Sequence, residues 1–245
     1  MPSVTLWLLD ASHMHEDDIK FFVKQLGASE IRRYSAFKRR ERKRQFLLGR
    51  MLLRLAVARL LSLPPDTLGV VERTGNAPQL LIPDSQGLQP SFSLSHSREW
   101  VACVLSSSGT LGVDIEVKDA TRDVTSISYL AFHPEEHGWL LSQPAAARRL
   151  AFYQLWCTRE ALYKLMSNLG RERVLSPLVG ADGTLAVHGA SWHCYTLSHS
   201  ALIVAVCSDR PLSPLNKVEL PRLTRADWLA PARLTPRLSP GAVIT

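Results

Sequence analysis

The segment Leu94-Ser95-His96-Ser97 occurs a second time as Leu197-Ser198-His199-Ser200, and this recurrence decides how the fold is organised. A Val-Ala pair follows each copy at the same spacing, so the offset between the copies stays at 103 residues. An apolar helical pattern precedes the strand-like residues in both regions, over 48–61 and 154–167. We therefore expect an α+β fold: a pseudo-dimer of two similar halves, with the active site in the cleft between them.

Proline, glycine and the periodicity of apolar residues place the expected boundaries. We expect an N-terminal α+β half over 1–108, a C-terminal half over 109–212, and a proline-rich tail over 213–245 that wraps the surface or is disordered. The expected strands are 4–9, 91–95, 100–105, 111–117, 185–187, 191–197 and 202–207. The expected helices are 17–26, 46–61 and 144–170, and the polar stretch 118–134 is expected to be irregular.

Composition limits the classes of protein that this chain can be. The 245 residues are 46 % hydrophobic and 21 % charged, which excludes a disordered chain or a small disulfide-stapled scaffold. The net charge of +7 predicts an anionic partner, which could be nucleic acid, a membrane surface, an acidic protein or a phosphorylated small molecule. The four cysteines, Cys103, Cys157, Cys194 and Cys207, lack zinc-site spacing and are expected to be buried, reduced thiols. No secretory signal or membrane-spanning run stands out, so we expect a cytoplasmic protein.

Two carboxylates lie close together in Gly112-Val113-Asp114-Ile115-Glu116. Residues two apart in a strand share a face, so Asp114 and Glu116 project together while Val113 and Ile115 point to the core. Such a pair invites a hard cation such as Mg²⁺. The alternative is a half-buried strand with a solvated acidic face.

A second charged group lies on the predicted helix 144–170. Trp156, Glu160 and Lys164 are spaced at one helical turn and share a face. The simple interpretation is an exposed Glu–Lys pair that adds little stability. The tryptophan indicates that this face is buried, and a buried ion pair calls for a functional explanation.

Two further features admit several interpretations. Ser95 and His96 are adjacent in a strand and point to opposite faces, so they do not form a nucleophile–base pair, although they could bind a phosphate. The basic run over 32–44 could be a solvated helix face, a nucleic-acid site, or a source of arginine and lysine for phosphates or an acidic protein.

Taken together, these segments resemble the 4′-phosphopantetheinyl transferases, in particular the long, pseudo-dimeric type that activates surfactin synthetase and related enzymes. The family pattern Gly-[Ile/Val]-Asp-[Ile/Val]-Glu, followed by Trp-x-x-[Lys/Arg]-Glu-[Ala/Ser]-x-x-Lys, matches residues 112–116 and 156–164. The Ser-His segment over 93–97 and the helix start Arg44-Gln45-Phe46-Leu47-Leu48-Gly49 match two further family segments. The resemblance covers about residues 30–210.

The resemblance implies a metal and two catalytic side chains. Asp114, Glu116 and Glu160 would hold Mg²⁺ against the pyrophosphate of coenzyme A, which is the substrate. Glu160 would also be the general base for the attacking serine, directly or through water. Lys164 would stabilise the leaving pyrophosphate oxygen or donate a proton to it.

The resemblance also implies which residues bind coenzyme A. Arg44, Ser95 and His96 would contact the phosphates on the adenosine side, and Arg159 and Lys164 would lie near the pyrophosphate together with Asp114. The sequence departs from the family pattern at Gly75-Asn76-Ala77-Pro78, where Ala77 stands in place of a basic residue and Arg73 is a candidate substitute. Arg159 replaces the commoner lysine.

The expected function is transfer of phosphopantetheine from coenzyme A to a serine of an apo acyl, peptidyl or polyketide carrier protein, with release of 3′,5′-ADP. Carrier proteins are acidic, so a basic surface would steer them, and the stretch 118–133 is a candidate docking element. We expect a monomer that needs no nucleic acid or membrane. The alternatives are a nucleic-acid-binding basic protein and a non-catalytic relative that binds carrier proteins.

Overall fold

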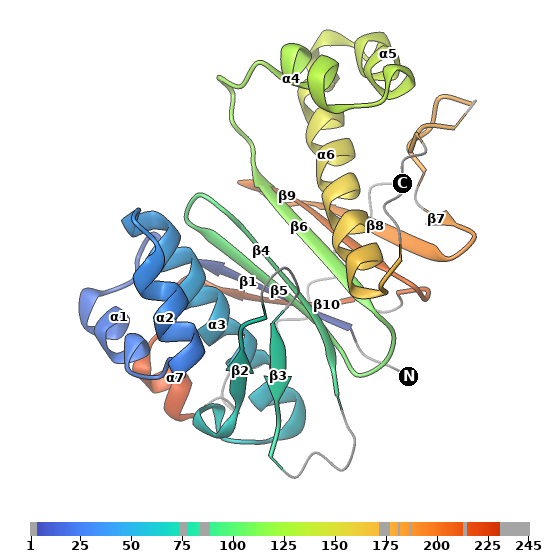
Figure 1. Cartoon of the computed structure of the whole chain (residues 1–245). Coiled ribbons are helices and arrows are strands. Elements are labelled where there is room, and N and C mark those ends of the chain that lie inside the picture. The colour runs from blue at the N-terminus through green and yellow to red at the C-terminus, as the bar shows by residue number, and fades with distance from the viewer. Residues whose placement is uncertain are drawn as a thin grey trace. The chain divides into compact units, whose positions relative to one another are not determined.

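The computed structural model describes residues 4–73, 78–83, 89–171, 177–180, 182–186, 188–212 and 215–230 (Figure 1). The chain divides into two compact units. Unit 1 comprises residues 1–109 and 213–240, and unit 2 comprises residues 110–212 and 241–245. Both units combine a four-stranded sheet with helices, so the α+β class is confirmed.

Unit 1 is built on a sheet with the strand order β10-β1-β5-β4. Strand β1 pairs in parallel with β10 and antiparallel with β5, and β4 and β5 form an antiparallel hairpin. The long helix α3 (Arg40–Leu61) packs against the sheet. The strands are β1 (Val4–Asp10), β4 (Ser91–Ser97), β5 (Trp100–Ser106) and β10 (Leu215–Leu220). The smaller elements are α1 (Glu16–Val23), α2 (Ala28–Ala36), η1 (Pro65–Thr67), β2 (Gly69–Val71), β3 (Gln79–Leu81) and α7 (Arg225–Leu229).

Helix α3 owes its position to a long apolar face and two buried arginines. Leu47, Met51 and Leu55 recur at helical spacing and are fully buried in the core of unit 1. The helix ends at Ser62, which adopts a left-handed φ of 55°, just before the Pro64-Pro65 pair that the sequence marks as its end.

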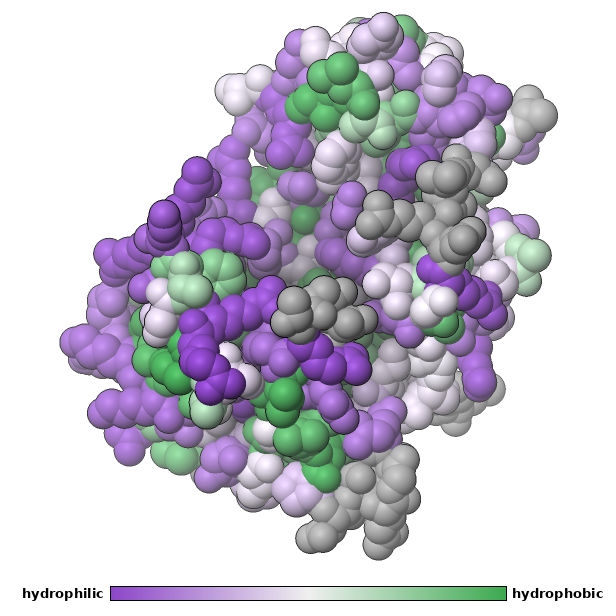
Figure 2. All heavy atoms as spheres, in the orientation of Figure 1, coloured by the Kyte–Doolittle hydropathy of each residue, from purple (hydrophilic) through white to green (hydrophobic). Residues whose placement is uncertain are grey.

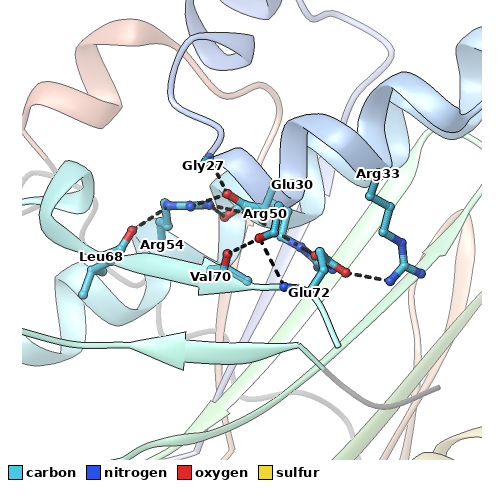
Figure 3. A network of polar contacts seen from close by, with 9 residues as sticks. Gly27, Glu30, Arg33, Arg50, Arg54, Leu68, Val70 and Glu72 are labelled. Carbon is cyan, nitrogen blue, oxygen red and sulfur yellow. Dashed lines mark hydrogen bonds and ion pairs between the residues drawn. The ribbon is translucent and has the colours of Figure 1, made fainter. Parts of the chain in front are cut away.

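A network of buried charges joins α2, α3 and the end of β2 (Figure 3). Glu30 on α2 is 0 % exposed and accepts two hydrogen bonds from Arg54, of 2.6 and 2.9 Å, and one of 2.8 Å from the Gly27 N–H. Arg50, one turn earlier on α3, binds Glu72 through Nε and Nη2 at 2.7 and 2.6 Å. The two arginines and two glutamates balance, so no buried charge is left without an opposite charge.

Unit 2 is built on a sheet with the order β6-β9-β8-β7, all antiparallel. Helix α6 packs against β6 and β9, and α4 and α5 form the connection between β6 and α6. The strands are β6 (Leu111–Val117), β7 (His188–Gly189), β8 (Trp192–Ser198) and β9 (Leu202–Ser208). The helices are α4 (Val124–Ala131), α5 (Pro134–Ser142) and α6 (Ala145–Asn168).

The two units share one topology. In each unit a first strand leads to a long helix and then to a hairpin, and the second hairpin strand pairs antiparallel with the first strand. The repeated four letters do not occupy equivalent hairpin positions, because Ser95 pairs with Ala102 whereas Ser198 pairs with Ile203. The topology therefore supports duplication better than the letters do, and the pseudo-dimeric cleft stays a prediction.

Two segments differ from the expectations. The stretch 118–134, expected to be irregular, contains α4, because the Asp123 side chain accepts hydrogen bonds from the N–H groups of Thr125 and Ser126 and caps the helix. The tail contributes β10 and α7 instead of only wrapping the surface, since Val218 and Leu220 alternate into the core of unit 1 beside β1. The tail beyond residue 230 lies outside the described residues.

The expectation of four reduced thiols is wrong for one pair. Cys194 on β8 faces Cys207 on β9, and the two form a disulfide, while Cys103 and Cys157 are free and buried. Cysteine spacing alone does not reveal this pair, because facing positions follow from strand register. Among the described residues, we find no helix whose length and apolar character would let it cross a membrane.

Removal of one charge from the network of unit 1 should destabilise the protein strongly. Glu30→Gln leaves the Arg54 guanidinium buried beside a neutral group, so we expect a loss of about 3–5 kcal/mol in the free energy of unfolding. Urea titration followed by circular dichroism measures it. The control is Lys20→Ala, which breaks the exposed ion pair with Asp17 and should cost less than about 1 kcal/mol. Equal losses for the two variants would contradict the prediction.

Candidate functional site

Gly112 lets helix α6 approach strand β6 at backbone distance. A β-carbon built at Gly112 would lie 2.0 Å from the Ala161 carbonyl oxygen and 2.6 Å from the Leu165 nitrogen. Any side chain is therefore excluded unless the helix moves. Residues 112, 114 and 116 share one face of β6, so the contact places α6 directly over the carboxylate face of the strand.

Asp114 on β6 and Lys164 on α6 form an ion pair between the strand and the helix. Asp114 is only 7 % exposed, and Lys164 Nζ lies 2.8 Å from its Oδ1 and 2.9 Å from the Val113 carbonyl oxygen. The solvated acidic face that the sequence left open is therefore wrong for Asp114. The simple interpretation of the helix is an ion pair between Glu160 and Lys164. Lys164 instead forms its ion pair with Asp114 on the strand.

Glu160 is the third member of the group. It lies half-buried on α6, one turn before Lys164. Burial raises the pKa of Glu160 above its ordinary value of 4.5, and the nearby negative charge of Asp114 raises it further, while Lys164 and Arg159 oppose the shift. Two carboxylates and one ammonium thus interact in one place, with one negative charge in excess.

Glu116 lies at the outer end of the same strand face. Its Oε2 is 3.9 Å from Arg122 Nη1, and the side chain is partly exposed. Arg122 in turn lies over the Tyr153 ring, at 5.6 Å from the centroid. Within the described ranges, we find no group of three His, Cys, Asp or Glu side chains that lie close enough together to hold a metal ion.

Arg159 does not stand free beside this group. Its Nη1 lies 2.6 and 2.7 Å from the two carboxylate oxygens of Glu136, a residue of α5 that is 0 % exposed. Sequence reasoning missed Glu136 as a partner. The residue occupies the third position of α5, where a glutamate commonly caps the helix, and nothing in that pattern shows that it is buried.

The predicted phosphate ligands of unit 1 do not form one cluster. Ser95 is buried and His96 exposed, so they take opposite faces of β4 as expected. Arg42 Nη1 lies 2.9 Å from His96 Nε2, which makes Arg42 a further cation at this position. Arg44 donates through Nη2 to the Ala11 carbonyl oxygen instead.

Arg44 also lines a cavity of about 290 Å³ in unit 1 together with Arg40 and Arg98, and with Glu41 and Glu99. The Arg44 Nε is buried and has no hydrogen-bond partner in the structure. Of the predicted phosphate ligands, Arg44 lines this cavity. Ala77, where the family has a basic residue, lies outside the described residues.

The basic run divides between two helices. Residues 28–36 form α2 and residues from Arg40 onward form α3, and most of the cations between 32 and 42 are exposed. Figure 2 shows the resulting hydrophilic surface over α2 and the start of α3. The run is therefore mostly a solvated helical surface, which leaves its partner open.

Comparison with known proteins identifies the class. The sequence model of the 4′-phosphopantetheinyl transferase superfamily matches residues 110–197. The chain is 30 % identical over 178 residues to the 4′-phosphopantetheinyl transferase psf-1 of Bacillus pumilus, covering 69 % of this chain and 72 % of that protein. It is 27 % identical over 164 residues to the 4′-phosphopantetheinyl transferase HetI of a Nostoc species, covering 66 % and 67 %.

A putative 4′-phosphopantetheinyl transferase of Synechocystis is 30 % identical over 139 residues, and the match spans 56 % of its length and 57 % of this chain. The chain belongs to the 4′-phosphopantetheinyl transferase superfamily. The expected class of enzyme is thus confirmed at the level of the family. The roles of the individual site residues stay predictions.

The contact at Gly112 can be tested with a pair of glycine variants. Gly112→Ala should lower the free energy of unfolding by at least the ~1–3 kcal/mol typical of an overpacked site, because the clash is with backbone atoms. Gly138→Ala in α5 is the matched control, since a β-carbon there meets no atom within 4 Å and should leave stability unchanged or raise it by up to about 1 kcal/mol. Thermal unfolding measures both. A neutral Gly112→Ala would contradict the close approach.

Proposed function

We propose that this protein transfers the 4′-phosphopantetheine group of coenzyme A to a serine hydroxyl of an apo carrier protein and releases 3′,5′-ADP. Membership of the superfamily supports the reaction class. The observation that carries the proposal to particular residues is the grouping of Asp114, Glu160 and Lys164.

We further propose that Asp114, Glu116 and Glu160 hold Mg²⁺. Carboxylate oxygens are the ligands that Mg²⁺ prefers. Burial, and after it the negative charge of Asp114, raises the pKa of Glu160, and a bound cation would favour the charged carboxylate against both effects. Asp114 and Glu160 fit the ion on this ground, whereas Glu116 would have to turn away from Arg122. The ion would supply charge neutralisation at the pyrophosphate.

The chain's own side chains then account for the proton transfers and for binding. The environment that raises the pKa of Glu160 makes this carboxylate a stronger base, suited to accept the proton of the attacking serine. Lys164 forms an ion pair with Asp114, and in this proposal it stabilises the leaving pyrophosphate oxygen. We assign the contacts to the adenosine-side phosphates to Arg44, Ser95 and His96, and we leave Arg159 out, because Glu136 already binds it.

The carrier protein is the partner that the reaction requires. Helix α4 presents Tyr129 and Leu130, which are 73 % and 83 % exposed, and Figure 2 shows an apolar patch over this helix. We propose that the stretch 118–133 docks the carrier, whose acidic surface the basic chain attracts. A monomeric, cytoplasmic enzyme with its site in a cleft between two similar halves completes the proposal.

The transfer itself is tested by intact mass spectrometry. We expect an apo acyl carrier protein incubated with this protein, coenzyme A and Mg²⁺ to gain one phosphopantetheine group, and EDTA to prevent the gain. Asp114→Ala and Glu160→Ala should abolish transfer, because each removes a proposed ligand of the Mg²⁺ that neutralises the pyrophosphate, and Glu160→Ala also removes the proposed base. The far-ultraviolet circular dichroism of both variants checks that they fold.

Retained transfer in both variants would refute the site. If no acyl, peptidyl or polyketide carrier gains mass and coenzyme A does not bind, the proposed function is wrong. Salt-sensitive binding to DNA in that case would favour the nucleic-acid alternative.

We expect the charge of the half-buried Glu160 to lower the free energy of unfolding at neutral pH. Its carboxyl holds its proton to a higher pH in the folded protein than in the unfolded chain, so ionisation above its ordinary value of 4.5 destabilises the fold. Without Mg²⁺, Glu160→Gln should therefore be more stable than the wild type at pH 7. The difference should disappear as the pH falls below 4.5. Urea unfolding across this pH range measures it.

The control for this series is Glu99→Gln, which removes the charge of an exposed carboxylate in the β4–β5 turn and so reports the effect of the substitution type alone. Added Mg²⁺ should stabilise the wild type more than Glu160→Gln, because the ion binds the folded protein through Glu160. A Glu160→Gln variant that is less stable than the wild type at pH 7 would contradict the prediction.

A further inference from the structure

We propose that Glu136 is a positioning residue of the transferase site, which acts by holding Arg159 and thereby fixes the rotation of α6 that points Glu160 toward Asp114. The inference rests on the proposed function, because it assigns Glu136 to the geometry of that reaction. It also changes the expected role of Arg159, from a phosphate ligand to the partner of a buried carboxylate.

The carboxylate of Glu136 has donors from three separate segments. Arg159 Nη1 lies 2.6 and 2.7 Å from its two oxygens, the Leu178 N–H lies 2.8 Å from Oε1, and the His133 N–H lies 3.0 Å from Oε2. Glu136 is 0 % exposed, so these contacts replace all of its hydration. One side chain therefore joins the start of α5, the middle of α6 and the segment around residue 178.

The Leu178 segment is itself anchored. The Ala186 N–H donates to the Leu178 carbonyl oxygen at 2.7 Å, and Val179 and Leu185 form an isolated bridge. The His133 contact is part of the cap of α5. The carboxylate is thus bound by two segments that have hydrogen bonds of their own, and the Arg159 side chain, 25 % exposed, reaches it from α6.

Arg159 and Glu160 are adjacent on α6, so their side chains leave the helix about 100° apart. A tether at Arg159 therefore adds a constraint on the direction of Glu160, besides the buried face of α6 and the bonds of Lys164 to β6. Gly112 determines how close α6 comes to β6, and Ala161 and Leu165 supply the atoms in that contact. Glu136 adds the second constraint, which the close approach alone does not provide.

The charge balance supports the same assignment. Arg159 is already paired with a fully buried carboxylate, and taking it away would leave that charge buried without a partner, at high cost. Lys164, also on α6, contacts Asp114 of the site directly. The tether thus keeps the Arg159 charge away from the substrate phosphates and lets Lys164 face them.

The test uses three variants and one matched control in the full chain. Glu136→Gln keeps the shape and removes the charge, Arg159→Met removes the tether, and the double variant Glu136→Met/Arg159→Met removes both charges, so that no buried charge is left unpaired. The control is Glu30→Gln, which breaks the pair with Arg54 on α3 and removes the charge of a glutamate that is as buried as Glu136. Transfer kinetics, urea unfolding and hydrogen exchange of the peptide covering residues 152–168 are measured for each.

We expect kcat to fall about 10- to 100-fold in all three variants with KM for coenzyme A changed less than threefold, because misplacement of a catalytic group affects the reacting step. The double variant should be no worse than either single variant, and Arg159→Lys should restore much of the rate. Exchange in residues 152–168 should increase. Glu30→Gln should lose stability with kcat and this exchange unchanged.

Four results would overturn the proposal. An unchanged kcat in the double variant would do so, as would a fall in kcat for Glu30→Gln equal to that for Glu136→Gln. A raised KM for coenzyme A in Arg159→Met, with wild-type behaviour in Glu136→Gln, would restore Arg159 as a phosphate ligand. If the wild type transfers nothing, the proposed function fails instead. In that case hydrogen exchange alone tests whether Glu136 holds α6 through Arg159. Unchanged exchange of residues 152–168 in the three variants would refute it.

Discussion

The backbone contact between α6 and β6 at Gly112 is the constraint on which the candidate site depends. Because residue 112 has no side chain, the helix lies against the strand at van der Waals distance, over the face that carries Asp114. At this distance the Lys164 side chain reaches Asp114 and the Val113 carbonyl oxygen. A helix held farther away would leave Asp114 to water, and the interaction of Asp114 with Glu160 would be screened.

Buried or half-buried ion pairs connect the long helices α3 and α6 to neighbouring elements. Two of these pairs are Glu30 with Arg54 and Glu136 with Arg159. In each, the carboxylate also accepts a hydrogen bond from a backbone N–H, so its oxygens have partners. The pair of Asp114 and Lys164 differs, because Glu160 adds a second negative charge beside it. The excess negative charge occurs where the family pattern lies, which is the physical reason to place a cation and a phosphate reaction at this point.

Short-range patterns predicted much of the site. The alternation along 111–117 placed Asp114 and Glu116 on one face, and the helical period placed Glu160 one turn before Lys164, as the structure has them. The same patterns missed α4, whose signal was the capping Asp123, and β10, whose signal was the alternation of Val218 and Leu220. They also could not show Glu136, since burial of a helix-capping glutamate depends on what packs above it.

The sequence by itself determined the α+β class, the order of the motifs, the faces that their residues share and the excess of positive charge. Only the tertiary structure decided which distant groups meet: Lys164 with Asp114, Arg159 with Glu136, Cys194 with Cys207, and β10 with β1. Local periodicity records the direction in which each side chain points, because it follows from backbone geometry. The identity of the partner depends on how closely two segments pack and in which register, and here a glycine and a set of buried charges decide that.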